Sequence, residues 1–197
     1  MHVLVINLDR CPERLVSTVH ELERIGLSAT RIPAVDGRHL VLDESGSIPG
    51  FKKRGRTREN YYRGLAGCYF SHIRALQHAI DADQWPCLIV EDDILIVGDG
   101  PLLLPDTSKE IIYFGGLDTP STIYGTHAIC YKTKEAATMA LGHLVTHPGS
   151  PDHSLIQLWK RIGQPHYARP YRIWQCDGYS LISEKVMYRF SSKNPTP

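Results

Sequence analysis

The residues that most constrain the fold are three consecutive acids, Glu91, Asp92 and Asp93, placed between two apolar runs. Residues 87–90 read Cys-Leu-Ile-Val and residues 94–97 read Ile-Leu-Ile-Val. Such runs are typical of buried strands, so we expect the acids where a buried strand ends. Like charges repel one another there unless a cation compensates them. Because hard oxygen ligands suit Mn²⁺ or Mg²⁺, the acidic run predicts a divalent metal site.

Two interpretations of the acidic run remain open at this point. If the segment stays extended, Glu91 and Asp93 lie on one face of the strand and Asp92 on the other, because side chains alternate. In the first interpretation these carboxylates bind a metal that holds substrate phosphates. In the second, they form an acidic strand end that caps a following turn.

Composition indicates one globular domain. The chain has 197 residues, 42% hydrophobic and 22% charged, which fits a single domain at 1–190 followed by a disordered tail at 191–197. The formal net charge of +1 gives no overall field that would attract nucleic acid. Five cysteines without a C-x-x-C pair favour reduced thiols and a cytoplasmic location. No apolar stretch reaches the ~20 residues of a membrane span, although peripheral membrane contact stays open.

Strand-like and helix-like segments alternate along the chain. Strands are expected at 2–8, 30–35, 87–90, 111–114 and 126–131, and helices at 12–25, 67–82, 133–145 and 153–161. This alternation predicts an α/β, Rossmann-like domain with a mostly parallel, helix-covered sheet. Ligands of such sheets bind at the carboxyl ends of the strands.

Two short segments could bind a phosphorylated ligand. Arg10 and Arg14 share one face at the start of the first helix, beside its unpaired amides, which favours a phosphate or diphosphate. A solvated helix face would use the same residues. Asp36 and Gly37 follow a strand, where the carboxylate could contact a ribose hydroxyl or could serve the turn alone.

Residues 38–63 lack periodicity and are expected to form a long, mobile, basic loop. Its last part runs from Lys52 to Arg63 and contains six cations, with Phe51 just before it and Tyr61 and Tyr62 near its end. Three interpretations remain open for this basic run: a solvated loop, a lid over a donor diphosphate, or a patch that binds an anionic acceptor such as a phosphorylated glycan or DNA.

The absence of several common motifs narrows the range of reactions that the chain could catalyse. The sequence contains no G-x-G-x-x-G after the first strand, no G-x-x-x-x-G-K-[ST], no G-x-S-x-G and no H-E-x-x-H. Dinucleotide oxidoreductases, P-loop phosphotransferases, serine hydrolases of that type and zinc peptidases therefore have little support. A metal-assisted reaction on a phosphorylated substrate remains.

An ordered set of short motifs resembles glycosyltransferase family 25, which includes bacterial lipooligosaccharide galactosyltransferases and collagen galactosyltransferases. The similarity spans about residues 3–175. The motifs are Asn7-Leu8-Asp9-Arg10 with Arg14, Ala34-Val35-Asp36-Gly37, Gly67-Cys68-Tyr69-Phe70-Ser71-His72, Leu88-Ile89-Val90-Glu91-Asp92-Asp93, Gly125-Thr126-His127-Ala128 and Pro151-Asp152. The resemblance implies a GT-A-like fold, a nucleotide-sugar donor such as a UDP-sugar, Mn²⁺ or Mg²⁺, and inversion at the anomeric carbon. The chain departs from the family pattern at Leu65-Ala66, where members often carry Glu-Ile, and in its basic run.

The resemblance also implies roles around the donor. Glu91 and Asp93 are similar to the metal-binding carboxylate pair of the family, and Asp92 would reach the donor ribose or sugar. His127 would be a further metal ligand or a buried strand residue. The residues that resemble the donor-binding blocks are Asn7, Arg10, Arg14, Asp36, Gly37, Ser71, His72 and Arg74. For His72 the alternative is a core histidine with its hydrogen bonds satisfied.

Further residues are candidates for catalysis and close packing. Asp152 is the expected general base that removes the acceptor proton, and a simple helix N-cap is its alternative. His153 could do the same work. Gly115 and Gly116 follow a strand and would let the backbone approach a ligand closely.

The sequence thus predicts a metal-dependent inverting glycosyltransferase that moves a hexose from a nucleotide-diphosphate sugar to a hydroxyl of a glycan, of the lipooligosaccharide type. Two alternatives stay open. The acceptor could be a modified base in DNA, as the basic run would permit, or the chain could be a catalytically silent module of the same fold that binds a nucleotide or nucleic acid.

Overall fold

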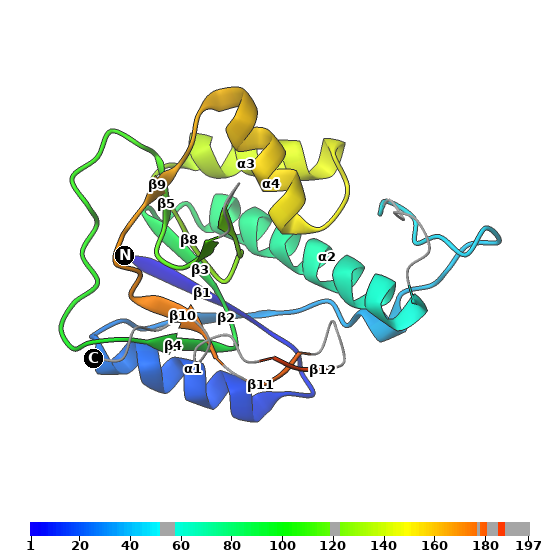
Figure 1. The fold of residues 1–197 in the computed structure, drawn as a ribbon, viewed down its shortest axis with the longest axis horizontal. Coiled ribbons are helices and arrows are strands. Elements are labelled where there is room, and N and C mark those ends of the chain that lie inside the picture. Colours follow the sequence, from blue (N-terminus) through cyan, green and yellow to red (C-terminus); the bar gives the residue numbers. More distant parts are fainter. Residues whose placement is uncertain (52–57, 119–122, 177, 181–184, 188–197) are drawn as a thin grey trace.

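The computed structural model of the chain describes residues 1–51, 58–118, 123–176, 178–180 and 185–187. A six-stranded sheet lies at its centre, with α1 (Pro12–Arg24) on one face and α2 (Glu59–Ala82), α3 (Lys134–Thr146) and α4 (Pro151–Ile162) on the other (Figure 1). The strands, in spatial order, are β2 (Thr30–Pro33), β1 (His2–Asn7), β3 (Cys87–Glu91), β8 (Ala128–Tyr131), β5 (Ile111–Tyr113) and β9 (His166–Tyr167).

Five of these strands run in one direction and β8 runs in the other. The pairs β1–β2, β1–β3 and β5–β9 are parallel, while β8 is antiparallel to both β3 and β5. Smaller antiparallel pairs are β4 (Ile94–Ile96) with β10 (Ile173–Gln175), β6 (Leu117–Asp118) with β7 (Ile123–Tyr124), and β11 (Gly178–Ser180) with β12 (Lys185–Met187). The expected α/β class with a mostly parallel, helix-covered sheet is confirmed.

The apolar strands divide the core into two layers. Along β1, Leu4 and Ile6 pack with the residues of α2, α3 and α4, whereas Val3 and Val5 pack on the side of α1, β4 and β10. Residues that alternate along a strand point to opposite faces of the sheet. Because helices cover both faces, β1 and β3 are apolar at nearly every position.

The carboxyl ends of β1 and β3 lie side by side, and this places the acidic run. Ile6 is paired with Glu91 in the parallel register, and β3 ends at Glu91. The chain leaves β1 through Asn7 and enters α1 at Pro12, so the start of α1 lies at the same edge of the sheet. This edge is where the sequence predicts ligand binding.

The predicted loop at 38–63 is wrong in two places. Helix α2 begins at Glu59 rather than at Gly67, because Tyr62 and Ala66 are buried on its inner face and Glu59 pairs with Arg63 one turn later. Before the helix, the short 3₁₀ helix η1 (Gly37–His39) leads into a segment whose residues Ile48 and Phe51 are 3% and 5% exposed.

The hydroxyl of Tyr62 anchors the segment around Ile48 and Phe51 to α2. It accepts a hydrogen bond from the Ile48 amide at 2.8 Å and donates one to the Phe51 carbonyl at 3.0 Å. Residues 52–57 of the basic run, and the predicted tail at 191–197, lie outside the described residues. Within the described part of the chain, no helix has both the length and the apolar character needed to cross a bilayer.

Candidate active site

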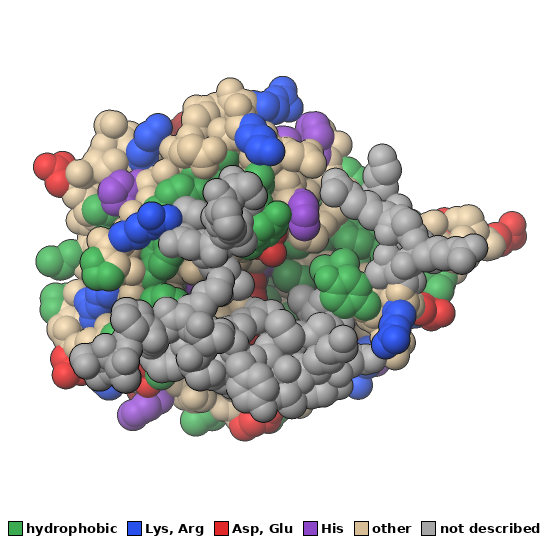
Figure 2. Space-filling view, viewed as in Figure 1, with side chains coloured by type: hydrophobic (Ala, Val, Ile, Leu, Met, Phe, Trp, Pro, Cys, Tyr) green, Lys and Arg blue, Asp and Glu red, His purple; other side chains and the backbone are tan. Residues whose placement is uncertain are grey.

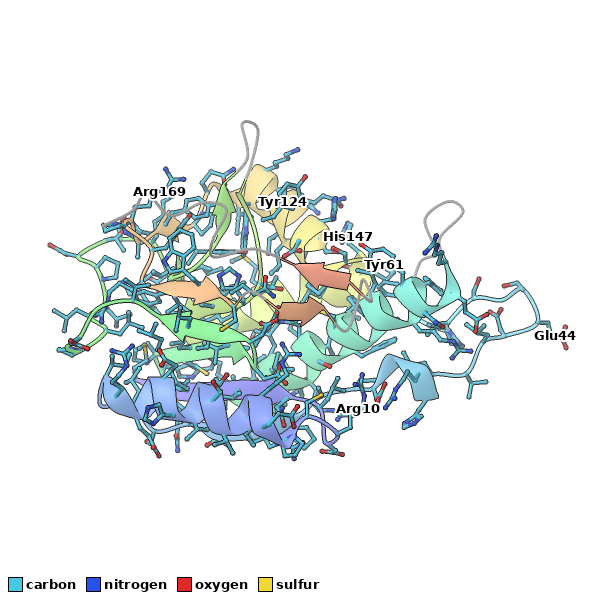
Figure 3. The ribbon with its side chains drawn as sticks, turned by 60° about the horizontal axis from the view of Figure 1, so that its bottom comes forward. Arg10, Glu44, Tyr61, Tyr124, His147 and Arg169 are labelled. Carbon is cyan, nitrogen blue, oxygen red and sulfur yellow. The ribbon has the colours of Figure 1, made fainter. Side chains whose placement is uncertain are left out.

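A cavity of about 460 Å³ opens at the carboxyl ends of β1 and β3. In Figure 2, acidic and hydrophobic side chains are visible in a hollow near the centre of the face. Figure 3 shows Arg10 beside the start of α1 and Tyr124 at the β6–β7 pair, two residues that line the cavity from different elements. Its size suits a small organic ligand. The predicted site residues that line it are Arg10, Arg14, Asp36, Gly37, Ser71, His72, Glu91, Asp92, Asp93 and Asp152.

Glu91 lies at the floor of this cavity in a network of hydrogen bonds. Its Oε1 accepts a hydrogen bond from Thr126 Oγ1 at 2.8 Å and lies 3.2 Å from His72 Nε2. Burial opposes ionisation of the carboxyl, but the hydrogen bond and charge of His72 outweigh it and lower the pKa of Glu91 to about 2. Glu91 is therefore a carboxylate at neutral pH.

Asp93 and Glu91 share a partner. The Gln175 amide nitrogen lies 3.1 and 3.2 Å from the two oxygens of Asp93 and 3.5 Å from Glu91 Oε2. Arg14 also pairs with Asp93 at 2.8 Å. Burial and the neighbouring Glu91 raise the pKa of Asp93, and Arg14 opposes that rise. Two carboxylates within reach of one amide form an oxygen-rich set of the kind that hard divalent cations prefer, so the residues fit the expected Mn²⁺ or Mg²⁺.

Asp92 contacts residues of β1 and α1. Strand β3 ends at Glu91, so the predicted alternation does not continue through Asp92 and Asp93, and Arg14 contacts both. Its Oδ2 accepts a hydrogen bond from Asn7 Nδ2 at 2.7 Å, and its Oδ1 lies 3.2 Å from Arg14. Burial raises the pKa of Asp92 to about 6, against the effect of Arg14 and Asn7. Asn7 also donates to the Cys11 carbonyl at 2.9 Å. Asn7 therefore positions Asp92 and does not itself line the cavity.

Asp36 gathers two guanidinium groups at another side of the cavity. It caps η1 by accepting a hydrogen bond from the Arg38 amide at 3.0 Å, and its Oδ2 pairs with Arg38 at 2.6 Å and with Arg10 at 2.9 Å. The Arg38 guanidinium, and then Arg10, hold the pKa of Asp36 well below its usual range. The arginines near α1 are thus oriented by carboxylates, in positions where they could also contact an anionic ligand.

Asp152 enters the cavity from the first turn of α4. Ser150 is the N-cap residue of this helix, so the N-cap alternative for Asp152 is wrong. The carboxylate accepts a hydrogen bond from the Gly125 amide at 3.1 Å. Burial, reinforced by the charge of Glu91, raises the pKa of Asp152. A buried carboxylate whose pKa is raised is a stronger base than an exposed one.

Comparison with known proteins identifies the family to which the chain belongs. The sequence model described as "Glycosyltransferase family 25 (LPS biosynthesis protein)" matches residues 1–114, more than half of the chain. The chain belongs to glycosyltransferase family 25. Proteins named "Glycosyltransferase 25 family member" are 37% identical over 98 residues in Drosophila pseudoobscura pseudoobscura and 34% identical over 98 residues in Aedes aegypti. Each match covers 47% of this chain and 16% of the relative.

Comparison with solved structures finds a Drosophila β1,4-galactosyltransferase 7 mutant in complex with manganese, UDP-galactose and xylobiose. The TM-score is 0.49 at 16% identity, over 86% of this chain and 66% of the other. The segment that matches the curated relatives spans only about a sixth of their length.

Several of the predicted site residues do not line the cavity. Gly115 is one of them: a Cβ there would lie 2.3 Å from His127 Nε2 and from the Ile173 carbonyl, so the missing side chain makes room for the histidine ring. Gly116 is buried beside it and is likewise absent from the lining. His127 is 1% exposed, and burial lowers its pKa, so it packs behind the floor of the cavity.

Arg74 and His153 also lie away from the cavity. Arg74 is exposed and donates to the Pro33 carbonyl at 2.6 Å, which ties α2 to β2. His153 is exposed on α4, where its Nδ1 lies 3.2 Å from Ser150 Oγ and its ring meets Tyr124 edge-on. Of the two candidate bases, Asp152 is the one that lines the cavity.

Other lining residues of this family 25 chain were not predicted from the sequence. Gln175 is brought to the acids by the pairing of β10 with β4, and Thr126 by the approach of the residues before β8 to the end of β3. Cys68 belongs to the Gly67-Cys68 motif, and its spacing of four residues from His72 could have indicated a shared helix face.

Proposed function

We propose that this chain transfers a hexose from a nucleotide-diphosphate sugar, in the first place a UDP-sugar, to a hydroxyl of a glycan, with inversion at the anomeric carbon. The observation that carries the proposal is the joint placement, in one cavity, of the acid pair Glu91 and Asp93, two arginines at or just before the start of α1, and the separate carboxylate of Asp152. Membership of glycosyltransferase family 25 supports the class of reaction.

The acids and arginines would hold the diphosphate end of the donor. Glu91 and Asp93 would bind Mn²⁺ or Mg²⁺, whose charge would neutralise the departing nucleoside diphosphate. Arg10 and Arg14 would contact phosphate oxygens, since guanidinium groups match their geometry. Asp92, held by Asn7, would accept hydrogen bonds from the ribose or the sugar.

Asp152 would act at the acceptor end. In an inverting transfer the acceptor hydroxyl attacks the anomeric carbon from the side opposite the leaving group, and a base must take its proton. Asp152 is held by the Gly125 amide and is not ion-paired with an arginine among the described contacts. The raised pKa that burial gives it favours proton uptake.

The test compares two variants of the cavity with one surface control. Asp93→Asn should lower Mn²⁺-dependent release of UDP from the donor by about 100-fold, because an amide is a weaker ligand than a carboxylate. Asp152→Asn should lower transfer to a glycan acceptor while UDP binding, measured by thermal shift, is retained. Asp99→Asn, at a side chain that is 94% exposed, is the control and should change neither quantity.

A screen of UDP-, GDP-, CMP- and TDP-sugars with and without Mn²⁺ identifies the donor. Undiminished UDP release in Asp93→Asn, with the same metal dependence as the wild type, would contradict the proposal. Binding of a donor without turnover in any acceptor screen would favour the catalytically silent module instead.

A further inference from the structure

A second set of potential metal ligands lies at the floor of the cavity. Cys68 and His72 on α2 and Glu91 at the end of β3 each offer a ligand atom, and these atoms lie within 4.8 Å of one another. This set differs from the acid pair, because it combines a thiol and an imidazole with one carboxylate. All three residues line the cavity, so an ion could reach them.

The local fold holds these side chains in place. Cys68 and His72 are four residues apart and therefore lie on the same face of α2. Ser71, between them, fixes that turn of the helix, since its hydroxyl donates to the Gly67 carbonyl at 2.6 Å and accepts from the Val35 amide at 2.8 Å. His72 is 5% exposed, and its Nε2 already lies 3.2 Å from Glu91 Oε1.

We propose that Cys68, His72 and Glu91 form a zinc-binding site. Thiolate, imidazole and carboxylate are the ligands that Zn²⁺ takes, whereas Mn²⁺ and Mg²⁺ favour sites built from oxygen. Ligands of tetrahedral zinc, at about 2.0–2.3 Å from the ion, stand about 3.5 Å apart, so atoms that lie within 4.8 Å of one another need to close by at most about 1 Å. On binding, the Cys68 thiol releases its proton to solvent as the Zn–S bond forms.

Glu91 belongs both to the proposed zinc site and to the acid pair, so binding of zinc would affect binding of Mn²⁺ or Mg²⁺. An ion bound by Cys68 and His72 withdraws Glu91 from the acid pair, so zinc competes with Mn²⁺ or Mg²⁺. Zinc therefore inhibits the enzyme, a consequence that rests on the proposed function. The zinc site itself does not rest on it, because binding can be measured without donor or acceptor.

The direct test uses Co²⁺ as a spectroscopic substitute for Zn²⁺ in the full chain. The wild type should show a thiolate-to-cobalt charge-transfer band that added Zn²⁺ removes, and Cys68→Ser should lack that band. Cys176→Ser, which changes another half-buried thiol, is the matched control and should keep it. Competition with a chromophoric chelator should show zinc affinity at least about tenfold weaker in Cys68→Ser than in the control.

A measurement on the wild type covers the case in which Cys68→Ser does not fold. Zn²⁺ should slow alkylation of Cys68, followed by mass spectrometry of its peptide, and should leave alkylation of Cys176 unchanged. Absence of the charge-transfer band in the wild type, an equal band in Cys68→Ser, or alkylation of Cys68 at the same rate with and without zinc would each overturn the zinc site. None of these readouts involves sugar transfer, so a failure of the proposed function is seen separately, in Asp93→Asn.

Discussion

Gly67→Ala tests how closely α2 packs against the turn that borders the cavity. A Cβ at Gly67 would lie 2.7 Å from the Val35 carbonyl oxygen and 2.8 Å from the Gly37 amide nitrogen. Both neighbours are backbone atoms, so neither can rotate away as the end of a side chain would. The turn is also tied to α2 one helical turn later, because Ser71 Oγ accepts the hydrogen bond of the Val35 amide.

The expected magnitude is the difference between two opposing effects. Overpacking costs about 1–3 kcal/mol, and two backbone clashes place Gly67→Ala at the upper end. Alanine favours a helix interior over glycine by about 0.8–1.0 kcal/mol. The variant should therefore lose about 1–2 kcal/mol of unfolding free energy and about 2–8 °C in Tm, measured by calorimetry, since 1 kcal/mol shifts Tm by about 2–4 °C at this chain length.

Gly142→Ala in α3 is the matched control. A Cβ there meets nothing within 4 Å, so only the gain in helix propensity remains and Tm should rise by about 2–4 °C. Because the displaced turn lines the cavity, Gly67→Ala should also raise the KM for the donor, and Gly142→Ala should not. A Tm for Gly67→Ala at or above that of the wild type would refute the packing argument.

Two further predictions concern the segment before α2. Tyr62→Phe should lose about 1–3 kcal/mol of unfolding free energy in urea titrations, because it removes the hydroxyl that bonds the Ile48 amide and the Phe51 carbonyl. The control is Tyr61→Phe, since Tyr61 is 41% exposed. Equal stability of Tyr62→Phe and the wild type would contradict this prediction. Asp36→Asn removes a carboxylate whose pKa is depressed in the folded state, so the wild type should be more stable than the variant above about pH 5 and should lose that advantage as pH falls below about 4. A difference that stays constant down to about pH 2 would exclude this linkage.

The central strands are well predicted from the sequence, because burial on both faces of the sheet requires short runs of consecutive apolar residues. Strands β1 and β3 are apolar at nearly every position, and only a sheet covered by helices on each side requires that. The start of α2 was missed for a related reason. Tyr62 is the first buried residue of α2 and stands among polar and charged residues in the sequence. The helical period at the start of α2 is therefore hard to recognise from the sequence.

The candidate site was predictable where it depends on strand ends and not where it depends on distant pairing. Glu91, Asp92 and Asp93 follow directly from the apolar run before them. Gln175 does not, because it reaches the acids through β10, whose register sets Trp174 opposite Leu95. Similarly, Gly115 indicates that some group packs closely against the backbone after β5, but the sequence does not show that this group is the ring of His127.

The charge balance at the floor of the cavity supports the proposal that one site binds both the donor and a cation. Glu91, Asp92, Asp93 and Asp152 contribute four carboxylates, and the one guanidinium that contacts them among the described ion pairs is that of Arg14. Burial, and then repulsion between neighbouring carboxylates, raises the pKa values of the three aspartates, so ionising them in this cavity costs free energy. A diphosphate placed beside these acids would add to the repulsion. Among the described residues, Arg10 already pairs with Asp36, and a divalent ion held by Glu91 and Asp93 would offset the charge of these acids.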